Sequence, residues 1–181
     1  MQTTTNQTST PLTPIQMLES SSTSSATDTA PQQRRMHFID IENLCGGSEF
    51  VRTNFRGVRE QLDAALVDHS PTMSVLGHGV YVRRDAPDLW FEWPARFVVG
   101  SGIDGADLAL LNTLMTEPAA RRSNEVVIGS GDGIFTEAVT YLQPFGVRVV
   151  VASFAQALSR RLALAADEVV LLDSVVACDA A

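Results

Sequence analysis

The chain has 181 residues, of which 45% are hydrophobic, and it carries a formal net charge of −8. Its length suits one domain with a hydrophobic core. It shows neither an apolar run of about 18 residues nor a secretory signal, so we expect no membrane partner. The negative charge argues against a protein that coats nucleic acid nonspecifically, and two distant cysteines, Cys45 and Cys178, indicate a reducing, cytoplasmic setting.

Predicted strands and helices alternate after a polar N-terminal segment. Residues 1–33 are rich in Ser, Thr and Gln, so we expect a disordered tail there, a folded domain over residues 34–175 and a frayed C-terminus over residues 176–181. Apolar, often β-branched stretches predict strands at residues 36–41, 74–82, 95–99, 126–128, 147–152 and 168–172. Apolar residues at helical spacing predict a helix at residues 53–67, and further helices are expected at residues 105–116, 134–142 and 159–165, with a short one around residues 89–91. This alternation predicts a three-layer α/β/α fold with a doubly wound, mainly parallel, Rossmann-like sheet.

Acidic turns follow three of the predicted strands. Asp40 ends the first strand, Asp104 and Asp107 lie where a helix begins after the third, and Asp132 lies in the Gly-Ser-Gly-Asp-Gly turn after the fourth. Because the carboxyl ends of parallel strands share one edge of a sheet, these carboxylates can converge where such sheets bind ligands. Clustered carboxylates repel each other unless a cation neutralises them. Oxygen ligands of this kind suit Mg²⁺ or Mn²⁺, so we expect one of these ions at this edge.

Ordinary structural roles are open for the same residues. Asp132 and Asp104 could each cap the helix that follows. Asn43, three residues after Asp40, could form a local turn, or its amide could orient a carboxylate, a water or a substrate oxygen. Glu42 alternates away from Asp40 and is expected to be a solvated side chain.

Four segments, in order and spacing, resemble motifs of the NYN domain family, the bacterial branch of the PIN-like nucleases. They are Phe38-Ile-Asp-Ile-Glu-Asn-Leu, Gly105-Ala-Asp-Leu-Ala-Leu-Leu, Ile128-Gly-Ser-Gly-Asp-Gly-Ile-Phe with the later Gly146-Val-Arg-Val-Val-Val-Ala-Ser, and Ala165-Ala-Asp-Glu-Val-Val-Leu-Leu. The resemblance extends over residues 36–173 and implies a PIN-like fold.

The resemblance also implies a function, namely a metal-dependent endoribonuclease in which a metal-activated water attacks a phosphodiester of single-stranded RNA. It implies Asp40, Asp107 and Asp132 as catalytic metal ligands, Asp104 as an alternate ligand, and Asn43 in a supporting catalytic role. Many members carry a second acid two residues after the position of Asp132, where this chain has Ile134.

Two alternatives stand beside the nuclease. The residue at position 134 and the net charge of −8 favour a catalytically weak or inactive PIN-like module that binds RNA or protein. A haloacid-dehalogenase-like phosphohydrolase would need an Asp-x-Asp pair after the first strand and a supporting lysine. The chain reads Asp40-Ile-Glu there and contains no lysine, which disfavours this enzyme.

Arginines and tryptophans are the candidates for contacts with RNA. Phosphate contacts are expected from residues in elements that start or end near the acidic edge, with a neighbouring hydroxyl in support: Arg52, Arg56, Arg83, Arg84 and Ser130. A run of charges is equally what a solvated face presents. Trp90 and Trp93 could stack on bases, or they could cover the sheet or a homodimer surface.

Overall fold

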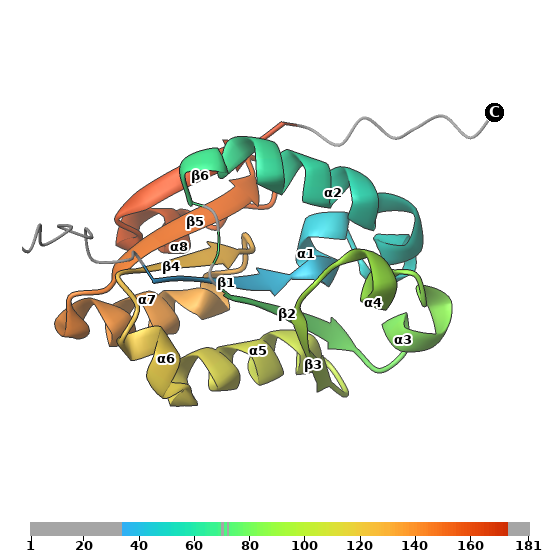
Figure 1. Cartoon of the computed structure of the whole chain (residues 1–181), viewed down its shortest axis with the longest axis horizontal. Coiled ribbons are helices and arrows are strands. Elements are labelled where there is room, and N and C mark those ends of the chain that lie inside the picture. The colour runs from blue at the N-terminus through green and yellow to red at the C-terminus, as the bar shows by residue number, and fades with distance from the viewer. Residues whose placement is uncertain (1–33, 70, 72, 174–181) are drawn as a thin grey trace, which may run out of the picture. The chain divides into compact units, whose positions relative to one another are not determined.

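Six strands form one sheet in this computed structural model, in the order β3-β2-β1-β4-β5-β6 (Figure 1). The structure describes residues 34–69, 71 and 73–173, so the predicted N-terminal tail and the predicted frayed C-terminus lie outside the described residues. The strands are β1 (Arg35–Asp40), β2 (Met73–Gly79), β3 (Arg96–Gly100), β4 (Glu125–Gly129), β5 (Arg148–Phe154) and β6 (Glu168–Leu172). Every pairing between neighbouring strands of this sheet is parallel, which confirms the predicted α/β fold.

Helices form the connections between the strands. The α-helices are α1 (Ile41–Cys45), α2 (Val51–Ala65), α3 (Val82–Asp85), α4 (Leu89–Glu92), α5 (Gly105–Thr116), α6 (Pro118–Arg121), α7 (Thr136–Leu142) and α8 (Arg160–Ala165). Short 3₁₀ turns lie at η1 (Ser48–Phe50), η2 (Val67–His69), η3 (Gly133–Phe135) and η4 (Gln143–Phe145). Among the described residues, no helix has the length and apolar character needed to cross a bilayer.

Two hydrophobic clusters hold helices on both faces of the sheet. Neighbouring residues of a strand point to opposite faces, so Phe38 packs in the cluster that includes α5, α7 and α8, whereas Ile39 packs in the cluster that includes α2. Figure 1 shows α2 on one side of the sheet and α5 to α7 on the other. The arrangement is therefore the predicted three-layer α/β/α sandwich.

Two short helices at the carboxyl edge differ from the prediction. Residues 80–82 were predicted to extend the second strand, but the strand ends at Gly79, whose backbone N–H donates to Glu42 Oε1 at 2.6 Å. The Glu42 side chain thus takes the place of a neighbouring strand as the acceptor for the Gly79 N–H. The chain then turns into α3. Ile41 was predicted to end the first strand but begins α1, which ends at Gly46 with the left-handed φ of 85° that glycine tolerates.

The strand order reverses between β1 and β4. The chain leaves β1 toward β2 and β3 on one side of the sheet, and after β4 it continues toward β5 and β6 on the other side. A crevice for ligands is expected beyond the carboxyl ends of the strands at such a reversal. Asp40 ends β1 there, and the Gly-Ser-Gly-Asp-Gly turn follows β4.

Candidate active site

Asp40 lies at the centre of the carboxyl edge and is held in place by two hydrogen bonds. Its side chain caps α1 by accepting the Asn43 backbone N–H at Oδ1, over 3.1 Å. The Ser130 hydroxyl donates to Asp40 Oδ2 over 3.0 Å. Because Asp40 is only 1% exposed, its carboxyl group is almost entirely removed from water.

Asp107 brings a second carboxyl group to Asp40. It lies in the first turn of α5, and the two side chains are within hydrogen-bonding reach of each other. Burial, together with the nearby charge of Asp107, raises the pKa of Asp40 well above its usual range. The charged form of Asp40 is therefore disfavoured, as expected for a buried carboxyl group beside a second one.

Ser130 and Asn43 connect this pair to the turn after β4. The Ser130 hydroxyl, which is fully buried, donates to Asp40 and accepts the Asp132 backbone N–H over 3.2 Å. The Asn43 side chain accepts the Gly131 backbone N–H at Oδ1, over 2.9 Å. The contacts of Ser130 with Asp40 and of Gly131 with Asn43 join segments about ninety positions apart in the chain. They therefore fix the position of the turn relative to the end of β1.

Asp132 and Asp104 differ in the contacts that their side chains make. Asp132 accepts the Ile134 backbone N–H at Oδ1 over 2.9 Å and so caps η3. Asp104 precedes α5 in the left-handed region at φ 53°, and its side chain makes no capping hydrogen bond. Capping was predicted as an alternative for both residues, and it is confirmed for Asp132 and wrong for Asp104. The charges of Asp132, Asp104 and Glu42 act on Asp107, whose pKa is raised by burial first and then by these charges.

Glu42 is a residue of this site that the sequence analysis missed. It was predicted to be solvated, but it accepts the Gly79 backbone N–H and joins α1 to the end of β2. A Cβ added at Gly79 would lie 2.9 Å from Glu42 Oε1, so the glycine makes this close approach feasible. In the sequence, the glycines of the Gly-His-Gly segment that ends β2 are the one local sign that another group approaches the backbone there.

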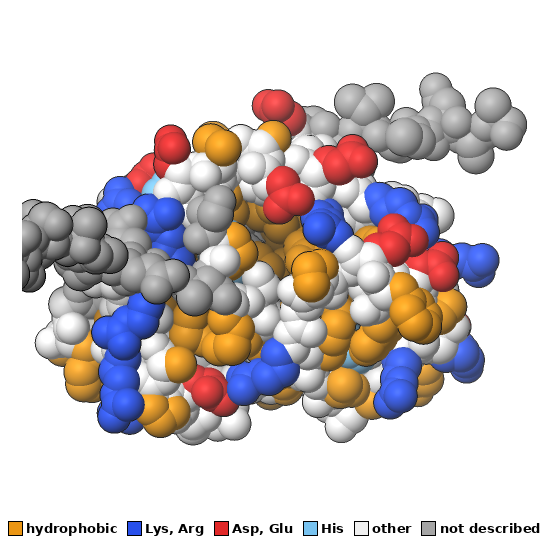
Figure 2. Space-filling model, in the orientation of Figure 1, with side chains coloured by type: hydrophobic (Ala, Val, Ile, Leu, Met, Phe, Trp, Pro, Cys, Tyr) orange, Lys and Arg blue, Asp and Glu red, His pale blue; other side chains and the backbone are white. Residues whose placement is uncertain are grey.

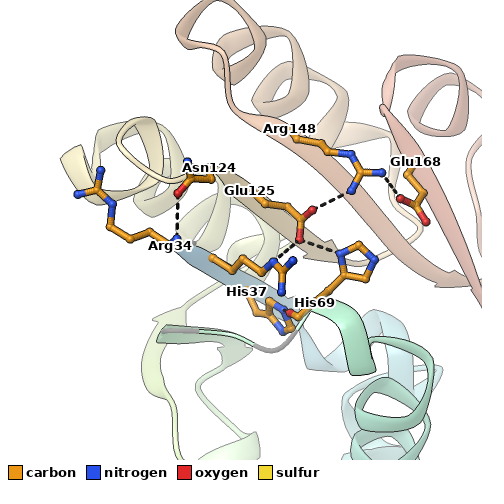
Figure 3. A network of polar contacts seen from close by, with 8 residues as sticks. Arg34, His37, His69, Asn124, Glu125, Arg148 and Glu168 are labelled. Atoms are coloured by element: carbon orange, nitrogen blue, oxygen red, sulfur yellow. Dashed lines mark hydrogen bonds and ion pairs between the residues drawn. The ribbon is translucent and has the colours of Figure 1, made fainter. Parts of the chain in front are cut away.

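The opposite edge of the sheet shows how this protein neutralises a buried acid. There, Glu125 is 5% exposed and pairs with Arg35 at 3.0 Å, His69 at 2.7 Å and Arg148 at 2.8 Å (Figure 3). Burial alone would raise the pKa of Glu125, but the hydrogen bonds from His69 and Arg148 lower it. Asp40 has no such basic partner among the described residues, so the two edges place buried carboxyl groups in opposite electrostatic surroundings.

The donor set at the carboxyl edge fits a hard divalent cation in its chemistry. A cation between Asp40 and Asp107 would offset the repulsion between the two carboxylates, whose oxygens are the ligands that Mg²⁺ and Mn²⁺ prefer. In the described part of the chain, no three His, Cys, Asp or Glu side chains lie close enough together to enclose a metal ion. Asp132 and Asp104 would therefore have to move closer to complete a ligand set.

The predicted RNA-binding arginines divide into two groups. Arg56 is occupied, because its guanidinium donates to Glu92 at 2.7 Å and to Asp88 at 3.3 Å, which joins α2 to α4. Arg52, Arg83 and Arg84 are exposed near the carboxyl edge, and α3 packs against η1 and the adjoining α2. Of these three, Arg84 pairs with its neighbour Asp85 at 2.7 Å.

Replacing Asn43 by alanine is expected to lower the free energy of unfolding by about 1–3 kcal/mol. The substitution leaves the N–H of the buried Gly131 without its acceptor, and a buried donor without a partner costs about this much. Chemical denaturation of the purified protein measures the change. Asn112→Ala is the control, because Asn112 is exposed on α5 and should change stability by less than about 0.5 kcal/mol. Equal stability of the two variants would contradict this account of the turn.

Comparisons with known proteins agree with the predicted family and the α/β fold. A family model described as the NYN domain matches residues 35–173. A solved structure of a protein of unknown function from Vibrio parahaemolyticus is similar to this chain with a TM-score of 0.55 and 16% sequence identity, covering 78% of this chain and 94% of that one. That similarity supports the fold alone. No curated protein matches the chain.

Proposed function

Because the chain belongs to the NYN domain family, a branch of the PIN-like superfamily with a nuclease fold, we propose that it is a metal-dependent endoribonuclease. One observation carries the proposal: at the reversal of strand order Asp40 is buried beside the half-buried Asp107 and has no basic partner among the described residues. A structural pair of carboxyl groups in that position would be costly to keep. A site that binds a cation and a phosphodiester explains why the cost is retained.

Each acidic residue has a part in this proposal. Asp40, Asp107 and Asp132 would hold Mg²⁺ or Mn²⁺, with Asp104 as an alternate ligand. The bound cation would lower the pKa of a water molecule and offset the negative charge on the phosphate oxygens. In the same proposal Asn43 and Ser130 are positioning residues, since their hydrogen bonds keep the Asp132 turn beside Asp40.

Phosphate binding is proposed for three arginines. Arg52, Arg83 and Arg84 are exposed beside the acidic edge and supply positive charge that the site itself lacks. Arg56 is given a structural role instead, because its guanidinium joins α2 to Glu92 of α4 and to Asp88 just before α4, whereas Arg84 pairs only with its own neighbour Asp85.

A second candidate function is a PIN-like module that binds RNA or protein without efficient catalysis. Two observations favour it. Ile134 occupies the position of a second acid in many relatives, and no three acidic side chains form a closed metal cluster in the described residues. The two candidates differ in whether RNA is cut, so a cleavage assay separates them.

Asp132→Asn is expected to slow metal-dependent cleavage of RNA by more than about 100-fold. Loss of an outer-sphere partner of a metal already costs about 10- to 100-fold, and loss of a ligand should cost more. The test incubates the full chain with labelled single-stranded RNA, with and without Mn²⁺. Asp68→Asn removes the same charge at an exposed position on η2 and should cleave like the unmodified protein. Equal cleavage by Asp132→Asn and the unmodified protein would reject the nuclease, and binding without cleavage would support the module.

A further inference from the structure

The two tryptophans predicted as candidates for base stacking face the protein interior. Trp93 is 7% exposed and belongs to the hydrophobic cluster under α2. Trp90 stacks on Phe97 with ring centroids 4.8 Å apart, and His78 meets its ring edge-on at 4.8 Å. Any stacking on RNA bases must therefore come from another aromatic side chain.

Tyr81 is an exposed aromatic residue beside the acidic site. It is 67% exposed and lies in the turn that follows β2. Asp40 pairs in register with Gly77, four residues before Tyr81. Four residues span at most about 14 Å and neighbouring strands lie about 5 Å apart, so the Cα atoms of Tyr81 and Asp40 are less than about 20 Å apart. A strand of RNA at the acidic site could reach Tyr81 within a few nucleotides.

Three arginines lie around Tyr81, and one of them, Arg84, is paired with Asp85. The Arg84 guanidinium lies 5.9 Å from the centroid of its ring. Arg83 makes no ion pair within residues 34–69, 71 and 73–173, and Arg52 lies close enough to Asp85 to act on its charge. Figure 2 shows basic and hydrophobic side chains side by side over α3, at the end of the molecule where the strands of Figure 1 point.

Phe91 provides the contrast within the same molecule. It is 90% exposed, more than Tyr81, but it lies on α4 between Asp88 and Glu92. Arg56 pairs with both acids, so the surface around Phe91 offers a phosphate backbone no unpaired positive charge, whereas Arg83 near Tyr81 makes no ion pair in the described part of the chain. The unpaired charge of Arg83 therefore favours Tyr81 over Phe91 as a residue placed for a nucleic acid.

We propose that Tyr81 stacks on an unpaired base of an RNA strand whose phosphates contact Arg52 and Arg83, which makes the site selective for single strands. The proposal rests on the ribonuclease function proposed above. Every base has a face on which an aromatic ring can stack, but in a duplex that face is covered by its neighbours. Tyr81 would thus be a specificity-determining residue outside the acidic site.

Tyr81→Ala tests the proposal through RNA affinity. We expect it to weaken binding of a fluorescent single-stranded oligoribonucleotide by roughly tenfold, in the range reported for loss of one stacked base, without changing binding of the same sequence as a duplex. Tyr81→Phe should bind like the parent, because the ring is kept. All variants are made in the full chain with Asp132→Asn, so that the RNA stays intact, and anisotropy measures the affinity.

Salt dependence separates stacking from electrostatic attraction. Tyr81→Ala removes no charge, so the slope of log affinity against log salt should stay the same. Arg83→Ala removes one phosphate contact and should reduce that slope by about 0.7. Phe91→Ala, which removes a similarly exposed ring, should leave affinity and slope unchanged.

The outcomes distinguish this inference from the function on which it rests. If the unmodified protein cleaves RNA and Tyr81→Ala binds single strands as tightly as its parent, only the inference about Tyr81 is overturned. An equal loss in Phe91→Ala would also overturn it, because the effect would then not be local. If the parent binds no RNA, both proposals fail. If Tyr81→Ala alters only the sedimentation of the protein, the turn is a protein contact and the inference is overturned.

Discussion

Asp40→Asn is expected to abolish metal-dependent cleavage while making the metal-free protein more stable near neutral pH. The two effects have one cause, which is the charge that burial and Asp107 make costly to keep. Asparagine has the same shape, can still accept the Asn43 backbone N–H, and can donate to Asp107. Cleavage should fall by more than about 100-fold, because a ligand is lost and not only an outer-sphere partner.

The sign of the stability change follows from the direction of the pKa shift. The pKa of Asp40 is raised in the folded state, so the folded protein holds this proton more tightly than the unfolded chain does. The resulting stabilisation is fully present below the unfolded-state pKa and is lost as pH rises through the folded-state pKa of Asp40. Asp40→Asn has no proton to lose, so its advantage over the unmodified protein should grow as pH rises through this window.

Thermal unfolding in a chelator, from about pH 4 to about pH 8, measures this difference. Added Mn²⁺ should raise the melting temperature of the unmodified protein, since a ligand that binds only the folded state stabilises it, and should leave Asp40→Asn unchanged. Asp68→Asn is again the control, and it should keep the response to Mn²⁺. An equal response in Asp40→Asn would show that Asp40 does not bind the ion.

Gly131→Ala is expected to lower both stability and activity. An added Cβ would lie 2.2 Å from the Ala157 carbonyl oxygen and 2.7 Å from Ser153 Oγ. The Ala157 contact is to backbone, which cannot turn aside, so the turn itself must move. The backbone of Gly131 is also held on both sides, because its N–H donates to Asn43 and its carbonyl accepts the Ser159 N–H at 2.8 Å.

We expect the free energy of unfolding of Gly131→Ala to fall by about 1–3 kcal/mol, the usual cost of overpacking. Cleavage should fall by about 100-fold, since moving a catalytic group by about 1 Å can have that effect. Gly57→Ala is the matched control, because a Cβ at Gly57 meets nothing within 4 Å on α2. It should raise stability by about 0.5–1 kcal/mol and leave cleavage unchanged. If Gly131→Ala behaved like Gly57→Ala, the packing of the turn would not matter.

Elements whose signal is local could be predicted from the sequence. The buried run at residues 126–128 and the helical spacing at residues 53–67 reappear in β4 and α2, because burial on both faces leaves a continuous apolar run and burial of one helix stripe leaves a helical period. The placement of three acidic turns at one edge also followed, since parallel strands end on the same side.

Elements that depend on a partner far away in the chain could not be predicted from the sequence. α1 and α3 are too short to show a period, and they exist because Asp40 caps one of them and Glu42 ends the strand before the other. For the same reason Trp90 was a candidate for stacking on bases, and only its contact with Phe97 turns it inward.

The sequence by itself therefore determined the fold class, the family and the acidic edge, because each leaves its mark in residues close together in the chain. Only the tertiary structure decided which side chains act on one another there. It paired Asp40 with Asp107, bound Arg56 to α4 and left Tyr81 exposed beside arginines. The physical reason is that burial, charge and hydrogen bonding at a site are sums over neighbours in space, and most of those neighbours come from other parts of the chain.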